Sequence, residues 1–123
     1  MESLLDLHRS VAWFLIFSNA AVGVWSLTAH WYPAMRSVVL WVCIGIAQIS
    51  AFAMAIIGAL MVNRNDIELD QFHALYGFST IVAVGILYSY RTSPFINDKQ
   101  YLLYGFGSLF IMGLGLRAMY IAP

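Results

Sequence analysis

Residues 37–62 read SVVLWVCIGIAQISAFAMAIIGALMV, an apolar run that contains no Asp, Glu, Lys, Arg, His or Pro. A helix of this length would extend about 39 Å, whereas the hydrocarbon core of a bilayer is about 30 Å thick. A soluble helix as long as this would carry a polar face, and this run has none. The run therefore predicts a transmembrane helix.

Three further apolar segments have the length of a membrane span, at about residues 8–29, 71–90 and 100–120. Short polar connections separate the four segments, and the first connection contains Pro33, which stops the first helix or opens the second. Because short connections join antiparallel neighbours, the segments alternate in direction. The sequence thus predicts an all-α, integral membrane four-helix up-down-up-down bundle, a single transmembrane domain over residues 1–123.

The composition restricts the class of protein. The chain is 62% hydrophobic and 10% charged, whereas soluble domains are nearer 45–50% apolar and about 25% charged. Zero net charge gives no sign of a nucleic-acid partner, and too little chain lies outside the spans for a soluble catalytic domain or an evident small-molecule substrate. Phosphate-loop, nucleophile-elbow and zinc motifs are absent from the sequence, so a non-enzyme is favoured. The lone Cys43 predicts a free thiol within a span.

The charges also bear on orientation. Lys and Arg are divided evenly between the two ends of the predicted bundle, but five of the six acidic residues fall at the end that holds the termini: Glu2, Asp6, Asp66, Glu68 and Asp70. We therefore expect both termini outside, with Arg36, Arg91 and Lys99 facing the cytoplasm of a bacterial-type plasma membrane.

The two halves of the chain resemble each other. Placing His8 over His73 aligns the first and third spans without a gap, with Ala12 on Gly77 and Trp25 on Tyr90. Such an alignment predicts a parallel repeat of two helices each, related by an axis along the membrane normal. Chance alignment of two apolar spans is the alternative, and both remain open at this point.

Small and polar residues within the spans suggest how the helices pack. Alanines recur every fourth residue along the second span and form a ridge that lets another helix approach closely: Ala47, Ala51, Ala55 and Ala59. Asn19 and Gln48 lie near the predicted midplane. They predict a hydrogen bond to each other or to a neighbouring helix, or a polar lining for a translocated ligand.

His8 and His73 are the candidate chemical site. Each opens an odd-numbered span, so both lie at the same end of the bundle and at similar depth. Two histidines so placed can ligate a b-type haem, and Ala12 and Gly77, one turn later, leave room for it. This layout of four spans with histidines at helix starts resembles that of small b-type cytochromes. The alternative is that both imidazoles bind headgroups or nearby acids such as Asp70.

Three functions follow as hypotheses. The leading one is a small non-catalytic accessory subunit, without a cofactor, at the edge of a larger membrane complex such as a respiratory or other energy-transducing assembly. Its partners would be the lipid bilayer and other integral membrane subunits. The second is a haem-binding electron-transfer or quinone-site protein that uses His8 and His73. The third is a small self-associating transporter or channel with Asn19 and Gln48 along its path.

Overall fold

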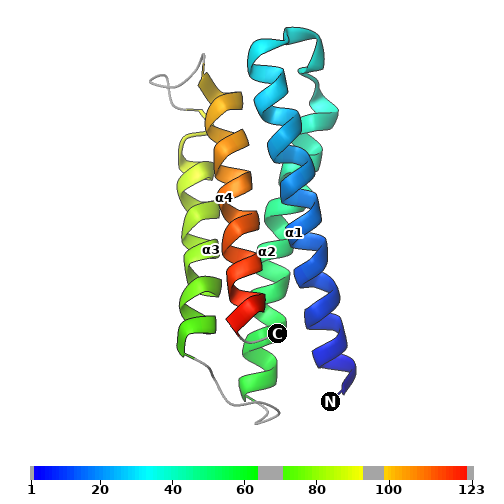
Figure 1. Ribbon diagram of the computed structural model, residues 1–123, viewed down its shortest axis with the longest axis vertical. Coiled ribbons are helices and arrows are strands. Elements are labelled where there is room, and N and C mark those ends of the chain that lie inside the picture. The colour runs from blue at the N-terminus through cyan, green and yellow to red at the C-terminus, as the bar shows by residue number, and fades with distance from the viewer. Residues whose placement is uncertain (1, 64–70, 93–98, 122–123) are drawn as a thin grey trace.

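The computed structural model describes residues 2–63, 71–92 and 99–121. The start of α1 and the end of α4 lie at one end of an antiparallel bundle (Figure 1). The described chain holds four helices long and apolar enough to cross a membrane, which confirms the predicted all-α, four-helix membrane fold. The helices are α1 (Glu2–Trp31), α2 (Val38–Asn63), α3 (Gln71–Ser89) and α4 (Gln100–Ile121), with a short 3-10 turn, η1 (Pro33–Met35), after α1.

The turn between α1 and α2 is held by local hydrogen bonds. Pro33 lacks a backbone N–H, and it opens η1 rather than extending α1. Arg36 then closes the end of α1, because its Nε donates to the Ala29 carbonyl at 2.7 Å and its Nη2 to the His30 carbonyl at 2.8 Å. The Ser37 hydroxyl accepts the Leu40 N–H at 3.2 Å and caps α2.

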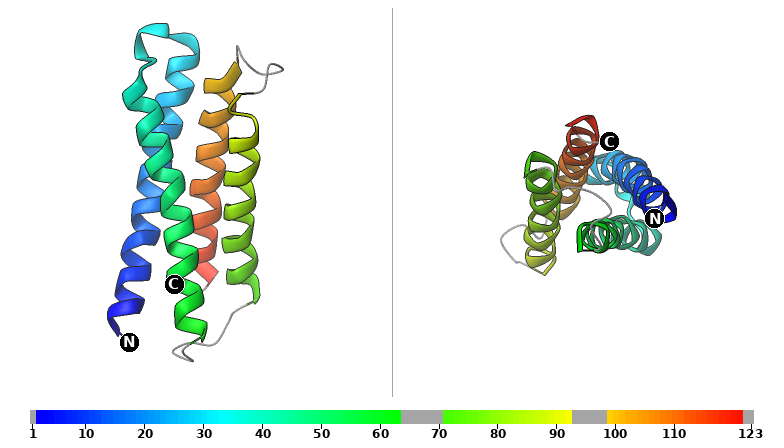
Figure 2. Two further views of the ribbon diagram at one scale, coloured as in Figure 1. Left: turned by 180° about the vertical axis from the view of Figure 1, so that it is seen from behind. Right: turned by 90° about the horizontal axis from the view of Figure 1, so that it is seen from below.

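The helices pack unequally around the bundle axis (Figure 2). α1 packs extensively on both α4 and α2, and α4 also packs on α3, whereas α2 and α3 have the sparsest contact of the four neighbouring pairs. Buried apolar side chains from all four helices form one core, among them Leu15, Leu40, Leu87 and Ile111. The seam between α2 and α3 is therefore the least packed side of the bundle.

Glycine allows α1 and α4 to approach closely. A side chain at Gly105 would place its Cβ 2.9 Å from the Leu27 backbone nitrogen, and one at Gly23 would lie 3.2 Å from the Gly105 carbonyl oxygen. These distances are too short for a normal contact with a backbone atom. Helices in lipid associate through such close packing, because lipid tails are as apolar as the side chains.

Candidate functional site

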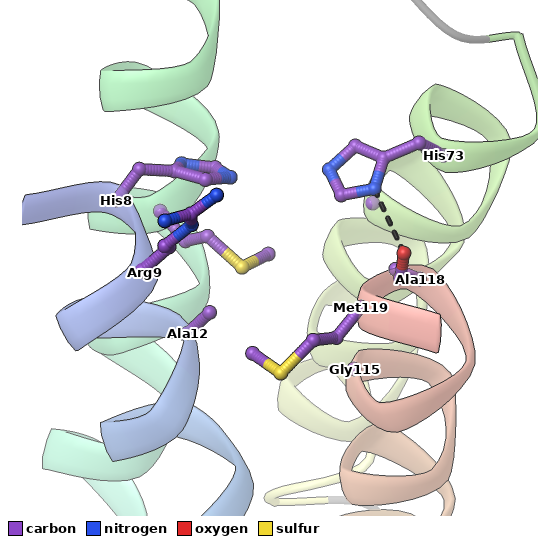
Figure 3. Close-up of a pocket in the computed structure, with 9 residues that line it drawn as sticks. His8, Arg9, Ala12, His73, Gly115, Ala118 and Met119 are labelled. Atoms are coloured by element: carbon purple, nitrogen blue, oxygen red, sulfur yellow. Dashed lines mark hydrogen bonds between the residues drawn. The ribbon is translucent and has the colours of Figure 1, made fainter. Parts of the chain in front are cut away.

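The structure brings His8 and His73 together across a small pocket (Figure 3). His8 lies on α1 and His73 on α3, which run in the same direction in an up-down bundle. Their ring centroids are 6.1 Å apart and their planes are tilted by 52°. A ring nitrogen of each faces the other ring in Figure 3, so two potential ligand atoms point into one space.

The hydrogen bond of His73 determines which nitrogen can bind a metal. Nδ1 lies 2.9 Å from the backbone carbonyl oxygen of Ala118 on α4. A carbonyl only accepts, so Nδ1 is the protonated donor and the lone pair of the neutral ring resides on Nε2. Metal-binding histidines commonly donate their other ring N–H to a carbonyl in this manner. Ala118 thus fixes both the tautomer and the orientation of His73.

His8 packs against α2 at a glycine. A Cβ at Gly58 would lie 3.2 Å from Cε1 of His8 and 3.7 Å from its Nδ1. The Met54 carbonyl also approaches this ring, but within the described residues Nδ1 makes no hydrogen bond of normal geometry and is buried. Gly58 therefore makes room for the His8 imidazole, whose Nδ1 is buried against α2.

The walls of the pocket are built from small and flexible residues. Ala12 and Gly77 lie one turn after the two histidines, and a Cβ at Gly77 would meet nothing within 4 Å. The remaining lining comes from all parts of this end of the bundle: Arg9, Met54, Gly115, Ala118 and Met119. The pocket is partly open and has room for about two water molecules. Met side chains have three rotatable bonds, so Met54 and Met119 can adjust the shape of this space.

The separation of the two rings allows both imidazoles to face one bound group. Their centroids are 6.1 Å apart, and the pocket that they line has room for about two water molecules. His8 and His73 are the residues that would hold a haem here, and a haem would need more room than this pocket provides. No group of three or more His, Cys, Asp or Glu gathers in the described ranges, so a carboxylate or thiolate metal centre has no ligand set there.

Asn19 and Gln48 do not form a hydrogen bond with each other. Asn19 is fully buried, and its Nδ2 donates to the Leu15 carbonyl at 2.9 Å and lies 3.4 Å from the Ala47 carbonyl of α2. Asn19 Oδ1 and Gln48 Nε2 are both buried without a hydrogen-bond partner among the described residues. The two side chains are therefore not joined to each other, and the contact of Asn19 is with the backbone of α2.

The alanine ridge is covered over only part of its length. Ala47 and Ala51 are fully buried, Ala55 is half-buried and Ala59 is exposed.

Asp66, Glu68 and Asp70, which the sequence placed near the histidines, lie outside the described residues. The structure does not bring His30 into the pocket, because it lies at the far end of α1.

Sequence reasoning missed the residues of α2 and α4 that line the pocket or pack against His8. Met54, Gly58 and Met119 stand in helices that are apolar on every side, so nothing in their spacing marks the face that meets His8 or His73. Ala12 and Gly77 were found because they share a helix with a histidine. No protein-family model, curated protein or solved structure matches this chain.

Proposed function

We propose that this protein is a membrane-embedded, b-type haem-binding electron-transfer protein in which His8 and His73 would hold the haem. The observation that carries the proposal is the pair of facing imidazoles, whose ring centroids are 6.1 Å apart. When bound, haem supplies one-electron transfer, a chemistry that the amino acids of this pocket lack.

The chain contributes orientation and space. The Ala118 carbonyl holds the Nδ1 proton of His73, so Nε2 carries the lone pair of the neutral ring and is the nitrogen that would bind the haem. Gly58 admits the His8 ring against α2, and Ala12 and Gly77 remove side-chain bulk one turn below each histidine. Arg9 lines the same pocket, and its guanidinium suits the carboxylates that haem carries.

A reduced-minus-oxidised visible spectrum of the protein, purified in mild detergent from cells supplied with a haem precursor, tests the proposal. We expect a sharp α-band and about one haem per chain. His8→Ala and His73→Ala should each lower haem content by more than about tenfold. His30→Ala is the matched control, because His30 lies at the other end of α1, and it should keep its haem.

Two results would overturn the haem proposal. One is a flat spectrum in the supplemented protein. The other is an unchanged spectrum in both histidine variants. Metal analysis of the same sample distinguishes a further case: copper without haem would assign the pocket to a soft ion held by its imidazoles and the thioethers of Met54 and Met119.

A role as a subunit of a larger membrane complex is a second candidate and is compatible with the first. Gly85 of α3 is exposed, and a Cβ there would meet nothing within 4 Å. A small residue open to the outside allows another transmembrane helix to approach. Gly85→Leu should release a co-purifying membrane subunit while leaving the bundle intact. If co-purification is unchanged, this face of α3 contacts lipid.

A further inference from the structure

The end of the bundle opposite His8 and His73 carries an aromatic platform. Trp41, near the start of α2, packs against Tyr101 and Tyr104 of α4, with ring centroids 5.3 and 5.0 Å apart. Trp41 Nε1 donates to the Tyr101 hydroxyl at 3.0 Å, and the Tyr104 hydroxyl donates to the Leu87 carbonyl of α3 at 2.7 Å. These contacts hold the three rings in place across three helices.

Two arginines lie on this platform. The guanidinium carbon of Arg36 is 5.0 Å from the ring centroid of Tyr101, and that of Arg91 is 4.0 Å from the ring centroid of Trp41. Both distances are typical of cation–π contacts. Arg36 is further held by its bonds to the Ala29 and His30 carbonyls. Two guanidinium groups thus lie on neighbouring rings, with Arg36 exposed and Arg91 half-buried.

The platform carries excess positive charge. No described carboxylate pairs with Arg36 or Arg91, whose interactions are with rings and backbone carbonyls. Lys99, exposed just before α4, adds a third cation. Asp98, the nearest acid in the sequence, lies outside the described residues. Trp and Tyr gather at the level of lipid headgroups, and cations there attract anionic lipids.

We propose that Arg36 and Arg91, stacked on Tyr101 and Trp41, bind the phosphate of an anionic membrane lipid. A guanidinium offers parallel N–H donors that match two phosphate oxygens, and stacking of Arg91 on the Trp41 ring leaves the edges of that group available. Arg36 already donates through Nε and one N–H of Nη2, so its Nη1 donors and the second N–H of Nη2 would face the phosphate. A zwitterionic headgroup carries its own compensating cation, so a lipid with net negative charge is preferred. The site lies at the other end of the bundle from the histidines and does not depend on haem.

The test compares thermal stability in phosphatidylglycerol and phosphatidylcholine nanodiscs, with native mass spectrometry to count retained phosphatidylglycerol. We expect a higher Tm in phosphatidylglycerol and about a fivefold loss of retained lipid in Arg91→Gln. Arg36→Gln should do the same, but it also removes bonds that close α1, so Arg91→Gln is the cleaner variant. Arg117→Gln, an exposed charge near the opposite end, is the matched control and should keep the phosphatidylglycerol preference.

Two outcomes would overturn the lipid site. An equal phosphatidylglycerol effect in wild type and Arg91→Gln would show that the platform does not bind the headgroup. Equal stabilisation by inorganic phosphate in phosphatidylcholine nanodiscs would assign the arginines to a soluble anion instead. The histidine variants should keep the lipid preference, so failure of the haem proposal and failure of this one are distinguishable.

Discussion

Gly58 is the residue on which the position of His8 depends most directly. Its missing side chain lets the imidazole lie against α2, where even a Cβ would approach Cε1 to 3.2 Å. We expect Gly58→Val to displace the ring and lower the haem-to-protein ratio severalfold, measured on purified protein. Gly45→Val is the control on the same helix, because a Cβ there would meet nothing within 4 Å. Equal haem content in the two variants would contradict this role for Gly58.

At the level of single residues, the sequence predicted one half of the pocket. His8 and His73 could be placed together because the direction of each helix follows from the number of preceding spans. Gly58 and Met119 could not be placed, because the rotation of one apolar helix against another depends on packing among all four. That rotation is set by local fits such as Gly105 on Leu27, which leave no periodic pattern in the sequence.

Among the helices, α2 offers an internal comparison along its alanine ridge. Ala51 is fully buried and Ala59 is exposed, although both occupy the same ridge. Ala51→Leu should reduce stability by about 1–3 kcal/mol through overpacking, whereas Ala59→Leu should stay within about 0.5 kcal/mol of wild type. Reversible unfolding in one detergent measures both. If the two variants behave alike, burial does not distinguish the two halves of the ridge.

The helices themselves follow closely from hydropathy, with one difference. α1 begins at Glu2, six residues before the segment expected at 8–29. Acidic residues near a helix N-terminus interact favourably with the helix dipole, so the polar lead can continue the helix although it is too polar for the bilayer interior. At the other end, Pro33 marks the break between α1 and α2 within two residues of where α1 ends.

For the whole molecule, the four helices alternate in direction, so the two ends of the bundle should face opposite sides of the membrane. Asn63 ends α2 at the same end as the start of α1, and Thr92 follows α3 at the opposite end; both are exposed. In a Cys43→Ser background, we expect a membrane-impermeant maleimide to label Asn63→Cys in intact cells and Thr92→Cys only after lysis. The reverse pattern would invert the orientation that the acidic residues favour. Labelling of both in intact cells would contradict the four-span topology.

Short connections and span lengths were enough to predict the four-helix bundle, but not the unequal packing between its helix pairs. α4 packs on both α1 and α3, whereas α2 and α3 barely meet. The glycines of α4 explain the close contacts, since Gly105 faces α1 and Gly107 faces α3. The positions of these glycines are evident in the sequence, but the helix that each glycine contacts could not be predicted from it.

The depth of His8 has an electrical consequence. It lies at the start of the segment expected to cross the bilayer, residues 8–29, and so near one membrane surface. A charge held there would sense only a small part of the transmembrane voltage, which is worth about 2.3 kcal/mol per 100 mV for a complete crossing. An electron that arrived and left by this end would therefore do almost no work against the membrane potential. Energy conservation would have to come from whatever receives the electron, rather than from passage through this bundle.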